Sequence, residues 1–447
     1  MARSLRIAIF LGSFPVVSET FILRQITGLI DLGHSVDIFA NSRPDGSGPV
    51  QPEVGQYRLL ERTTYIEGPA EALDWEMPIF PITGRTWIPG SETSSLNIVR
   101  IAQALPKLAL CLIKNFPLTL RALSSAEYGY QAESLSTLYR LAHLGSVRAR
   151  YDVLHAHFGP VGNSFRFARE LWGAPLCVSF HGYDFSTLPR QEGKGMYEKL
   201  FQTADAVTVN SQFTRQEVEK LGCPPGLIDL LRVGLDPGRF RFKERSRKPE
   251  EPFRVLTVGR LVPIKGHAYV IQAVGRLKEQ GTGICLDIVG DGPEKDALSN
   301  LIRELKLEDA VVLHGSQTGP GIEQLLDRAH LFVLGSVNIE GDQEGQGLAL
   351  QEAQATGLPV IATNHGALPE GLAAGDSGFL VPEGDAGCLA ERINYLVTHP
   401  EVWSSMGRKG REFVEKNFDI HKLNHKLSAI YEKLIERHFE TKLRAGR

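Results

Sequence analysis

The chain alternates between short apolar segments of strand length and longer segments with helical spacing, in two separate runs. The first run opens with an apolar segment at 6–12 (RIAIFLG), a helical pattern over 21–32 and a strand-like segment at 36–40, and it resumes at 152–158. The second run begins at 253–260. Strands that alternate with helices form parallel sheets with helices on both faces. The pattern therefore predicts an α/β protein with two doubly wound, Rossmann-like parallel sheets.

Composition limits the classes of protein to which the chain can belong. Its 447 residues suffice for two ordinary domains, and 42% hydrophobic with 23% charged residues is typical of a globular protein. The net charge of −3 creates no overall positive field, so nucleic acid is not an expected partner. The 5 cysteines form no C-x-x-C pair, which disfavours a disulfide framework and a zinc knuckle. Because the apolar run at 7–11 is too short for a signal peptide, we expect a cytoplasmic protein.

A charged run that includes a proline, 243–251 (KERSRKPEE), is the best candidate for a domain boundary. We expect an N-terminal domain over 1–241, with an insertion at about 41–150, and a C-terminal domain over 252–417. Residues 418–447 are expected to be helical and could cross back to the N-terminal domain. Ligands of doubly wound sheets bind at the carboxyl ends of the strands, so we expect a site in a cleft between the two domains.

Glu344 and Glu352 lie around the start of a predicted helix over 346–356, the first on the entering loop and the second within the helix. Gly345 and Gly347 leave the backbone uncovered there. The first-turn N–H groups of the helix could therefore bind an anionic group such as a diphosphate. The alternative is that one glutamate caps the helix and the other faces solvent.

The loop VGRLVPIKG is a second candidate site, because Arg260 and Lys265 in it follow a predicted strand. Pro263 stiffens the turn between these two cations, and Gly266 ends it. Two cations beside a glycine-flanked helix start suggest a clamp for a diphosphate. The alternative is that both cations belong to ordinary solvated surface.

Three histidines lie on or just after predicted strands in the N-terminal half. His181, in SFHGYDF, follows a strand, whereas His155 and His157, in HAHFG, lie at i and i+2 of one strand and therefore share a face. A metal ion would need a third ligand that the sequence does not supply. A structural role is therefore favoured for the pair, and no metal site is expected.

Five motifs in the C-terminal half together resemble glycosyltransferase family 4, whose members are retaining enzymes with the GT-B fold: GRLVPIKG, VGDGP, EGQGLALQE, ATGLPVIAT and GFLVPEGD. In the N-terminal half, SFPVVSETFILRQI, HAHFG and SFHGYDF are similar to the subgroup that builds bacterial exopolysaccharides, colanic-acid-type enzymes among them. The chain departs from many relatives in its first loop, where Gly12 is followed by SFPVVSET instead of a second glycine.

The resemblance implies a role for each candidate residue. Arg260 and Lys265 would hold the donor diphosphate and stabilise the departing nucleotide. Glu352 would bind the donor ribose, Glu344 would bind hydroxyls of the transferred sugar, and His181 would reach that sugar near the reacting centre. Further contacts to the phosphates or sugar are implied for the amides of Gly345, Gln346, Gly347 and Leu348. Segment 314–318 would flank the nucleobase, with His314, Gly315 and Gln317. Acceptor contacts are implied for Ser18, Glu19 and Thr20.

The implied reaction transfers a hexose from a UDP- or GDP-sugar to a glycan or polyprenyl-linked oligosaccharide in polysaccharide biosynthesis, with retention of configuration and without a metal or cofactor. The acceptor hydroxyl would attack the face from which the leaving group departs, and the phosphate would take its proton, so no protein base is needed. Two alternatives remain open. A catalytically silent scaffold should lose the clamp, and a nicotinamide-dependent dehydrogenase needs a G-x-G-x-x-G after a strand, which the chain lacks.

One further segment, 96–123, has cations at intervals of seven residues: Arg100, Lys107, Lys114 and Arg121. No acidic residue occurs over 96–126. On a helix this spacing drifts by only about 20° per repeat, so the cations would form a stripe flanked by apolar side chains. We predict that the segment, broken or kinked at Pro106 and Pro117, binds an anionic membrane surface and makes the protein peripheral on the cytoplasmic face of the inner membrane. The alternative is two core-facing helices whose cations extend to water.

Overall fold

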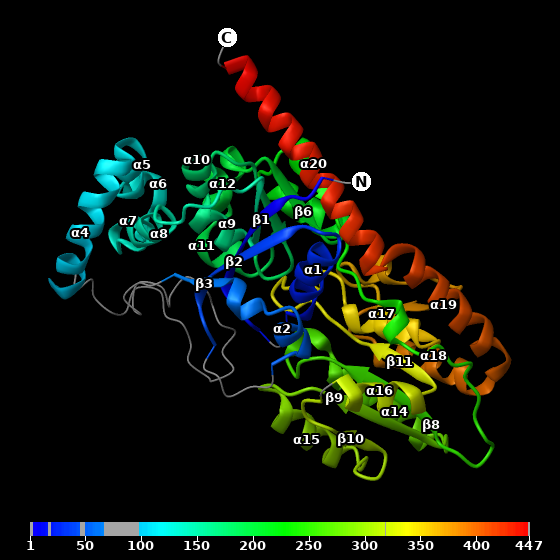
Figure 1. Ribbon diagram of the computed structural model, residues 1–447. Helices are drawn as coiled ribbons and strands as arrows, with labels where there is room; N and C mark the ends of the chain where they lie inside the picture. The colour runs from blue at the N-terminus through cyan, green and yellow to red at the C-terminus, as the bar shows by residue number, and fades with distance from the viewer. Residues whose placement is uncertain (1–2, 17–18, 45–49, 67–97, 318, 446–447) are drawn as a thin grey trace. The chain divides into compact units, whose positions relative to one another are not determined.

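The computed structural model describes residues 3–16, 19–44, 50–66, 98–317 and 319–445 (Figure 1). The chain forms two compact units. The first comprises Met1–Val209, Arg215–Leu231 and Asn424–Arg447, and the second comprises Asn210–Thr214 and Arg232–Leu423. No helix within the described ranges is both long and apolar enough to cross a membrane.

The sheet of the first unit has seven strands in the order β3-β2-β1-β4-β5-β6-β7, and all neighbours are parallel. The order reverses between β1 and β4, so the sheet is doubly wound, as the alternation predicts. Its strands are β1 (Arg6–Ser13), β2 (Ser35–Ser42), β3 (Thr63–Tyr65), β4 (Val153–His157), β5 (Leu176–Phe180), β6 (Ala206–Val209) and β7 (Ile228–Leu230). Strand β3 was not predicted, because three residues at the sheet edge are too few to show a period.

The helices of the first unit are mostly short. Those that connect the strands are α1 (Thr20–Asp31), α2 (Pro52–Gln56), α9 (Gly159–Phe165), α10 (Ala168–Trp172), α11 (Leu188–Glu192), α12 (Glu198–Thr203) and α13 (Gln212–Lys220). Ser211 caps α13, since its hydroxyl accepts a hydrogen bond from the Thr214 N–H at 2.9 Å. The N-cap position of α1 is occupied by Glu19.

A group of five helices follows at the edge of this unit: α4 (Ile98–Lys114), α5 (Phe116–Ala122), α6 (Ser125–Tyr128), α7 (Tyr130–Glu133) and α8 (Ser136–Leu144). Helix α4 continues through Pro106, so the break expected there is wrong, whereas the alternative of a kink stays a prediction. The helical run is interrupted at Asn115, between α4 and α5. The Asn115 side chain caps α5 by accepting a hydrogen bond from the Leu118 N–H at 3.4 Å, and Pro117 lies in the first turn of α5. Proline is tolerated in a first turn because the N–H it lacks has no helical partner there.

The sheet of the second unit has six parallel strands in the order β10-β9-β8-β11-β12-β13. The order reverses between β8 and β11, which confirms the second doubly wound sheet. Its strands are β8 (Phe253–Val258), β9 (Ile284–Val289), β10 (Val311–Leu313), β11 (Leu331–Leu334), β12 (Val360–Thr363) and β13 (Gly378–Val381). Its helices are α14 (His267–Glu279), α15 (Lys295–Glu304), α16 (Gly319–Arg328), α17 (Leu348–Ala355), α18 (Ala386–Thr398) and α19 (Trp403–Asn417), followed by the start of α20 (Ile420–Ala445).

Apolar clusters cover both faces of this sheet. Alternate residues of each strand point to opposite faces. Accordingly Val255 and Val333 pack with α14, α15 and α18, whereas their neighbours Leu256 and Phe332 pack with α16 and α17. A sheet covered on both faces exposes only its strand ends, so polar side chains that follow the strands are the ones available for ligands.

The charged run 243–251 lies within the second unit, although it was expected to separate the two domains. The reason is Arg245, whose side chain is buried and donates to the carbonyl oxygens of Leu326 and Asp327, both at 2.9 Å, and of Thr356 at 2.7 Å. These carbonyls end helices α16 and α17, where the last carbonyl groups have no helical partner. The run is therefore tied to the second unit by its own arginine.

Helix α20 begins in the second unit and from Asn424 onwards belongs to the first unit. Tyr431 and Ser428 on this helix contact buried histidines: the Tyr431 hydroxyl lies 2.6 Å from Nδ1 of His155, and Ser428 Oγ lies 2.9 Å from Nε2 of His34. These contacts between buried polar groups attach α20 to β4 and to the start of β2.

Candidate active site

Lys265 of the predicted clamp contacts Glu344, the predicted sugar-binding residue, at the point where the strand order of the second sheet reverses. Lys265 follows β8 and Glu344 follows β11, and Lys265 Nζ lies 2.5 Å from Glu344 Oε2. The two side chains are 17% and 14% exposed. Burial acts to raise the pKa of Glu344, but the charge and hydrogen bond of Lys265 outweigh it and hold this pKa below its ordinary value. The site therefore holds an ionised carboxylate and a lysine at a ligand-binding edge.

The start of α17 is formed as the glycine pattern predicts. Gly347 at the N-cap position has φ +76°, a left-handed conformation that favours glycine, and a Cβ there would lie 2.5 Å from Leu368 Cδ2 and push that side chain aside. Helix α17 spans Leu348–Ala355, two residues later than predicted at its start, and includes Glu352. The Gln346 side chain is engaged within the unit, since its amide donates to the Val233 carbonyl and accepts from the Val233 N–H, both at 2.7 Å.

Arg260 lies just past β8 on the loop that ends in Lys265. Its side chain is exposed, and its carbonyl oxygen lies 3.2 Å from Nε2 of the buried His267. Gly266, at φ +60°, ends the turn, as its place in the sequence suggests. A Cβ at Gly266 would lie 1.9 Å from the Gly335 carbonyl oxygen, so this close approach of the two loops admits only glycine.

The predicted nucleobase segment follows β10. His314 Nε2 lies 2.6 Å from Asp287 Oδ1, and Arg328 donates to the same oxygen at 2.7 Å. The Gln317 amide donates to the His314 carbonyl at 2.9 Å, and Gly315 has φ +65°. The last residue of the segment, Thr318, lies outside the described residues. Asp287 was not singled out from the sequence, because an aspartate within an apolar strand carries no motif.

In the first unit the three histidines form one row across β4 and β5. Both ring nitrogens of His155 form hydrogen bonds, with the Tyr431 hydroxyl at 2.6 Å and the Ser179 hydroxyl at 2.7 Å. His155 thus has the structural role that was expected of His155 and His157. His157 Nδ1 lies 3.1 Å from His181 Nε2. Burial lowers the pKa of His181 to about 3, so its ring is neutral at physiological pH and acts as a hydrogen-bonding group, without charge.

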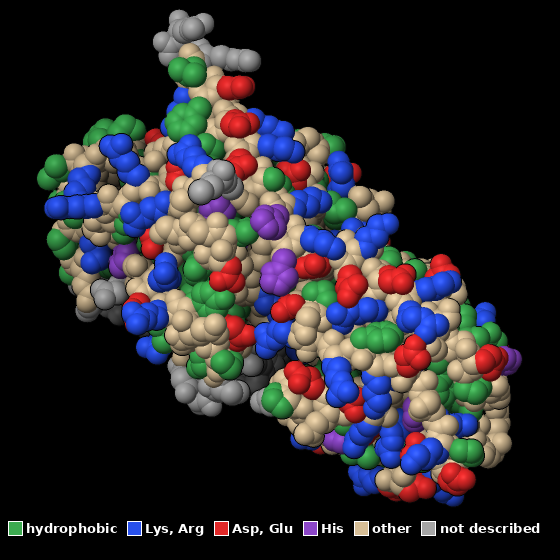
Figure 2. Space-filling view, turned by 45° about the vertical axis from the view of Figure 1, so that its right-hand side comes forward, with side chains coloured by type: hydrophobic (Ala, Val, Ile, Leu, Met, Phe, Trp, Pro, Cys, Tyr) green, Lys and Arg blue, Asp and Glu red, His purple; other side chains and the backbone are tan. Residues whose placement is uncertain are grey.

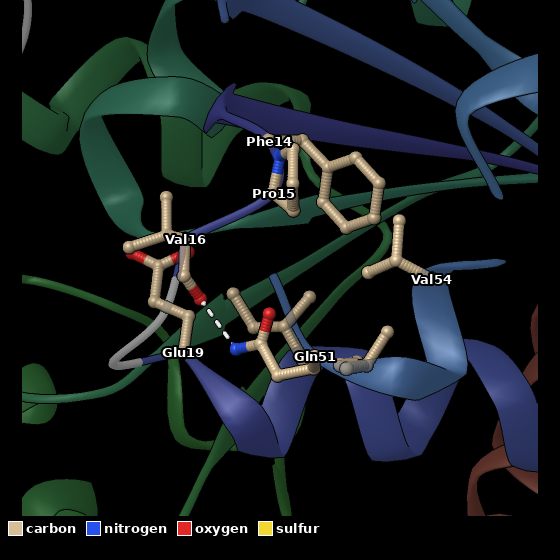
Figure 3. Close-up of a pocket in the computed structure, with 8 residues that line it drawn as sticks. Phe14, Pro15, Val16, Glu19, Gln51 and Val54 are labelled. Carbon is tan, nitrogen blue, oxygen red and sulfur yellow. Dashed lines mark hydrogen bonds between the residues drawn. The ribbon is translucent and has the colours of Figure 1, made fainter. Parts of the chain in front are cut away.

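Glu19, one of the predicted acceptor residues, lines a small pocket of the first unit, and Figure 3 shows that Glu19 and Val16 are at one end of it. Thr20 begins α1, and Ser18 lies outside the described residues. Gln51 lies between Val16 and Val54 in this view, and its amide donates to the Val16 carbonyl at 3.1 Å. Burial raises the pKa of Glu19 to about 7. The pocket lining is otherwise mainly apolar: Phe14, Pro15, Val16, Ile22, Leu23 and Val54.

The predicted residues therefore fall into two sets. Lys265, Glu344 and the α17 start lie together in the second unit, whereas His181 and Glu19 belong to the first. Within the described ranges no three His, Cys, Asp or Glu side chains gather as a metal ion would require. On the face shown in Figure 2, basic and acidic side chains lie interspersed.

Two family models match the chain. The model "Glycosyl transferase 4-like domain" matches residues 18–234, and "Glycosyl transferases group 1" matches residues 238–413. The glycosyltransferase WcaL of Escherichia coli (strain K12), assigned to colanic acid biosynthesis, is 32% identical over 435 residues, which cover 96% of this chain and 100% of WcaL. The amylovoran biosynthesis glycosyltransferase AmsK of Erwinia amylovora is 31% identical over 435 residues, with 96% and 100% covered.

Solved structures agree with the fold. Anabaena HepE in complex with UDP matches with a TM-score of 0.67 at 17% identity, and 96% of this chain and 100% of HepE are covered. Sucrose-phosphate synthase from Thermosynechococcus elongatus matches with a TM-score of 0.66 at 20% identity, with 97% and 100% covered.

The two doubly wound sheets and the matching solved structures define a protein of the GT-B fold. The chain belongs to glycosyltransferase family 4, in the subgroup that includes the colanic acid and amylovoran enzymes.

Proposed function

We propose that the protein is a retaining hexosyltransferase that uses a UDP- or GDP-sugar and acts in exopolysaccharide biosynthesis. The observation that carries this proposal is the Lys265–Glu344 pair at the reversal of the strand order, beside the glycine-lined start of α17. A diphosphate can bind the lysine and the helix N–H groups, while the carboxylate remains for sugar hydroxyls. The HepE structures, which hold UDP, UDP with glucose, and UDP-glucose, support a nucleotide-sugar donor.

The proposed reaction exchanges one bond to the anomeric carbon for another. The bond between the anomeric carbon and the diphosphate breaks, and Lys265 and Arg260 stabilise the negative charge that collects on the leaving group. The acceptor hydroxyl forms the new bond on the same face and transfers its proton to the departing phosphate. Lys265 thus supplies a positive charge at the place where many transferases use a metal ion, and we propose that no metal or cofactor takes part.

The remaining residues have binding roles in this proposal. Glu352, within α17, binds the donor ribose, and Glu344 binds hydroxyls of the transferred sugar. The amides of the α17 start bind the phosphates, and the segment from His314 to Gln317 flanks the nucleobase. In the first unit, the neutral His181 ring hydrogen-bonds to the transferred sugar, and Glu19 and Thr20 contact a glycan or polyprenyl-linked acceptor.

The stereochemistry of the product tests this proposal. A screen of UDP- and GDP-sugars that follows diphosphate release should identify the donor, and the anomeric configuration of the product can then be measured by NMR. We expect the configuration of the donor to be retained. An inverted linkage would reject the mechanism, and diphosphate binding without turnover of any sugar would favour the catalytically silent scaffold.

We further propose that helices α4 and α5 contact a membrane, and that apolar side chains supply most of the affinity. Three of the four cations in this segment contact their own unit: Lys107 Nζ lies 5.2 Å from the centroid of the Tyr139 ring, Lys114 donates to the Gly145 carbonyl at 3.3 Å, and Arg121 pairs with Glu170. The fourth, Arg100, has no described side chain. Most cations of the predicted stripe therefore already contact other groups of the protein.

Large apolar side chains are exposed on the same two helices, which lie at the periphery of the first unit in Figure 1. Ile113 is 84% exposed, and five others are between 40% and 59% exposed: Ile101, Leu105, Leu110, Phe116 and Leu120. Apolar side chains on the exposed face of a helix that lacks acidic residues fit the interface of an anionic bilayer. A lipid-linked acceptor would give the protein reason to bind there.

Liposome flotation tests this contact with two matched triple variants. Leu110→Ser, Ile113→Ser and Phe116→Ser should together lower binding to vesicles of phosphatidylcholine and phosphatidylglycerol by at least about tenfold, because each side chain loses roughly 1.5–3 kcal/mol of burial. Lys107→Gln, Lys114→Gln and Arg121→Gln should have the smaller effect. Equal binding by wild type and the serine variant, or no binding by either, would contradict the proposal.

A further inference from the structure

His365 is a buried histidine next to Glu344 that no motif of the sequence singles out. It follows β12, its side chain is 1% exposed, and it lies between two carboxyl-bearing residues. Its Nε2 accepts a hydrogen bond from the Glu344 backbone N–H at 3.2 Å, and its Nδ1 lies 2.9 Å from Glu383 Oε2. Both ring nitrogens are therefore engaged, one by the proposed sugar-binding residue and one by a carboxylate.

These two contacts determine the tautomer of the ring. A backbone N–H can only donate, so Nε2 of His365 must carry its lone pair towards Glu344. The ring proton is then on Nδ1, from which it is donated to Glu383. The same Glu383 oxygen accepts the backbone N–H of Asn338 at 2.7 Å, which fixes the carboxylate in place. A carboxylate that accepts from one ring nitrogen of a histidine fixes the tautomer and the orientation of the ring.

The loop that contains His365 also holds the other side of the Glu344 peptide. The Ala367 N–H donates to the Glu344 carbonyl oxygen at 2.9 Å. Gly366, between His365 and Ala367 in the sequence, has φ +51°. A Cβ at Gly366 would lie 2.5 Å from the Glu344 carbonyl oxygen, so the loop packs closely against the Glu344 peptide. The backbone of Glu344 is thus held at its N–H and at its carbonyl by residues 365–367, and its carboxylate is left to pair with Lys265.

We propose that His365, kept in its Nδ1–H tautomer by Glu383, is a positioning residue that fixes the Glu344 carboxylate for its contacts with Lys265 and with the transferred sugar. The inference rests on the proposed function of Glu344. Loss of the hydrogen bond from Glu344 to His365 allows the loop between β11 and α17 to shift. A displacement of about 1 Å at a reacting centre costs on the order of 10²-fold in rate.

The tautomer is tested first, because its measurement needs no substrate. Protein labelled with ¹⁵N in its histidines should show one neutral ring with the proton on Nδ1 whose signals disappear in His365→Gln. In Glu383→Ala, which removes a 42% exposed side chain and should leave the fold intact, the same ring should lose its fixed tautomer. A proton found on Nε2 of His365 in the wild type would overturn the proposal.

Kinetics then separate positioning from a general loss of structure. His365→Leu removes the acceptor, and we expect turnover of the donor found in the screen to fall by about 10²-fold. UDP and GDP should still bind within about twofold of wild type, because the proposal assigns the nucleotide to other groups. His365→Gln can offer its side-chain oxygen to the Glu344 N–H and should recover about tenfold of the loss, and Glu383→Ala should lose about tenfold.

Unchanged turnover in His365→Leu, or equal loss of UDP and GDP binding and of turnover in every variant, would overturn the positioning role. If His365→Leu does not fold, the turnover of His365→Gln and Glu383→Ala still decides whether His365 positions Glu344. Wild-type protein that turns over no nucleotide sugar would reject the proposed function instead, and the NMR result on the tautomer would stand separately.

Discussion

Replacing Lys265 by alanine is expected to lower the turnover of the nucleotide sugar by about 10²-fold or more while the fold persists. Lys265 is one of the two cations that we propose to hold the donor diphosphate, and its ammonium lies 2.5 Å from the Glu344 carboxylate. Its removal also takes away the main interactions that lower the pKa of Glu344, so burial should raise this pKa above its value in the wild type. Initial rates at saturating donor measure the effect.

A matched control separates the charge of Lys265 from net charge in general. Lys295→Ala removes an exposed lysine at the start of α15 in the same unit and should leave turnover within about twofold. Arg260→Ala should resemble Lys265→Ala if both cations hold the diphosphate. Wild-type rates in both variants would remove the clamp assignment.

Replacing Arg245 by leucine is expected to destabilise the second unit by about 3 kcal/mol. Burial lowers the pKa of Arg245 to about 10, so its guanidinium is still charged at neutral pH. It donates to the carbonyl groups that end α16 and α17, and leucine would leave these groups buried without donors. With an m-value of about 2 kcal/mol/M, the urea midpoint of this unit should fall by roughly 1.5 M.

The control is Arg241→Leu, a change of the same size at an exposed position four residues earlier, which should move the midpoint very little. Hydrogen exchange of the last amides in α16 and α17 should increase in the Arg245 variant alone. An unchanged midpoint would show that water or other groups replace the arginine.

The two sheets could be predicted because each strand is an apolar run between helical patterns, and this alternation admits few topologies. The predictions that failed concern features that depend on tertiary contacts. Strand β3 is three residues long, and its pairing with β2 is visible only in space. Helix α4 continues through Pro106 because its buried positions, such as Ala104 and Cys111, pack within the group of helices, and packing outweighs local propensity. Arg245 stands in a run of charges, where the pattern indicates solvent.

Lys265 and Glu344 could be predicted together because both follow strands, and the carboxyl ends of neighbouring parallel strands meet at one edge. His365 also follows a strand, but one histidine in NHG carries no spacing or partner that would mark it. Its importance comes from two contacts, with the Glu344 peptide and with Glu383, that lie 21 and 18 residues away along the chain. Such contacts are fixed by how the loops meet, which the sequence pattern does not contain.

The return of α20 to the first unit has a consequence for synthesis on the ribosome. The strands β1 to β7 emerge first, but the helix that supplies Tyr431 and Ser428 to their buried histidines emerges last. Between them lie roughly 200 residues of the second unit, which take about 10–40 s to translate. The second unit is almost continuous in the chain and can fold within that interval. The first domain to be made is therefore the last to be completed, and its unfinished surface must be protected while the second one folds.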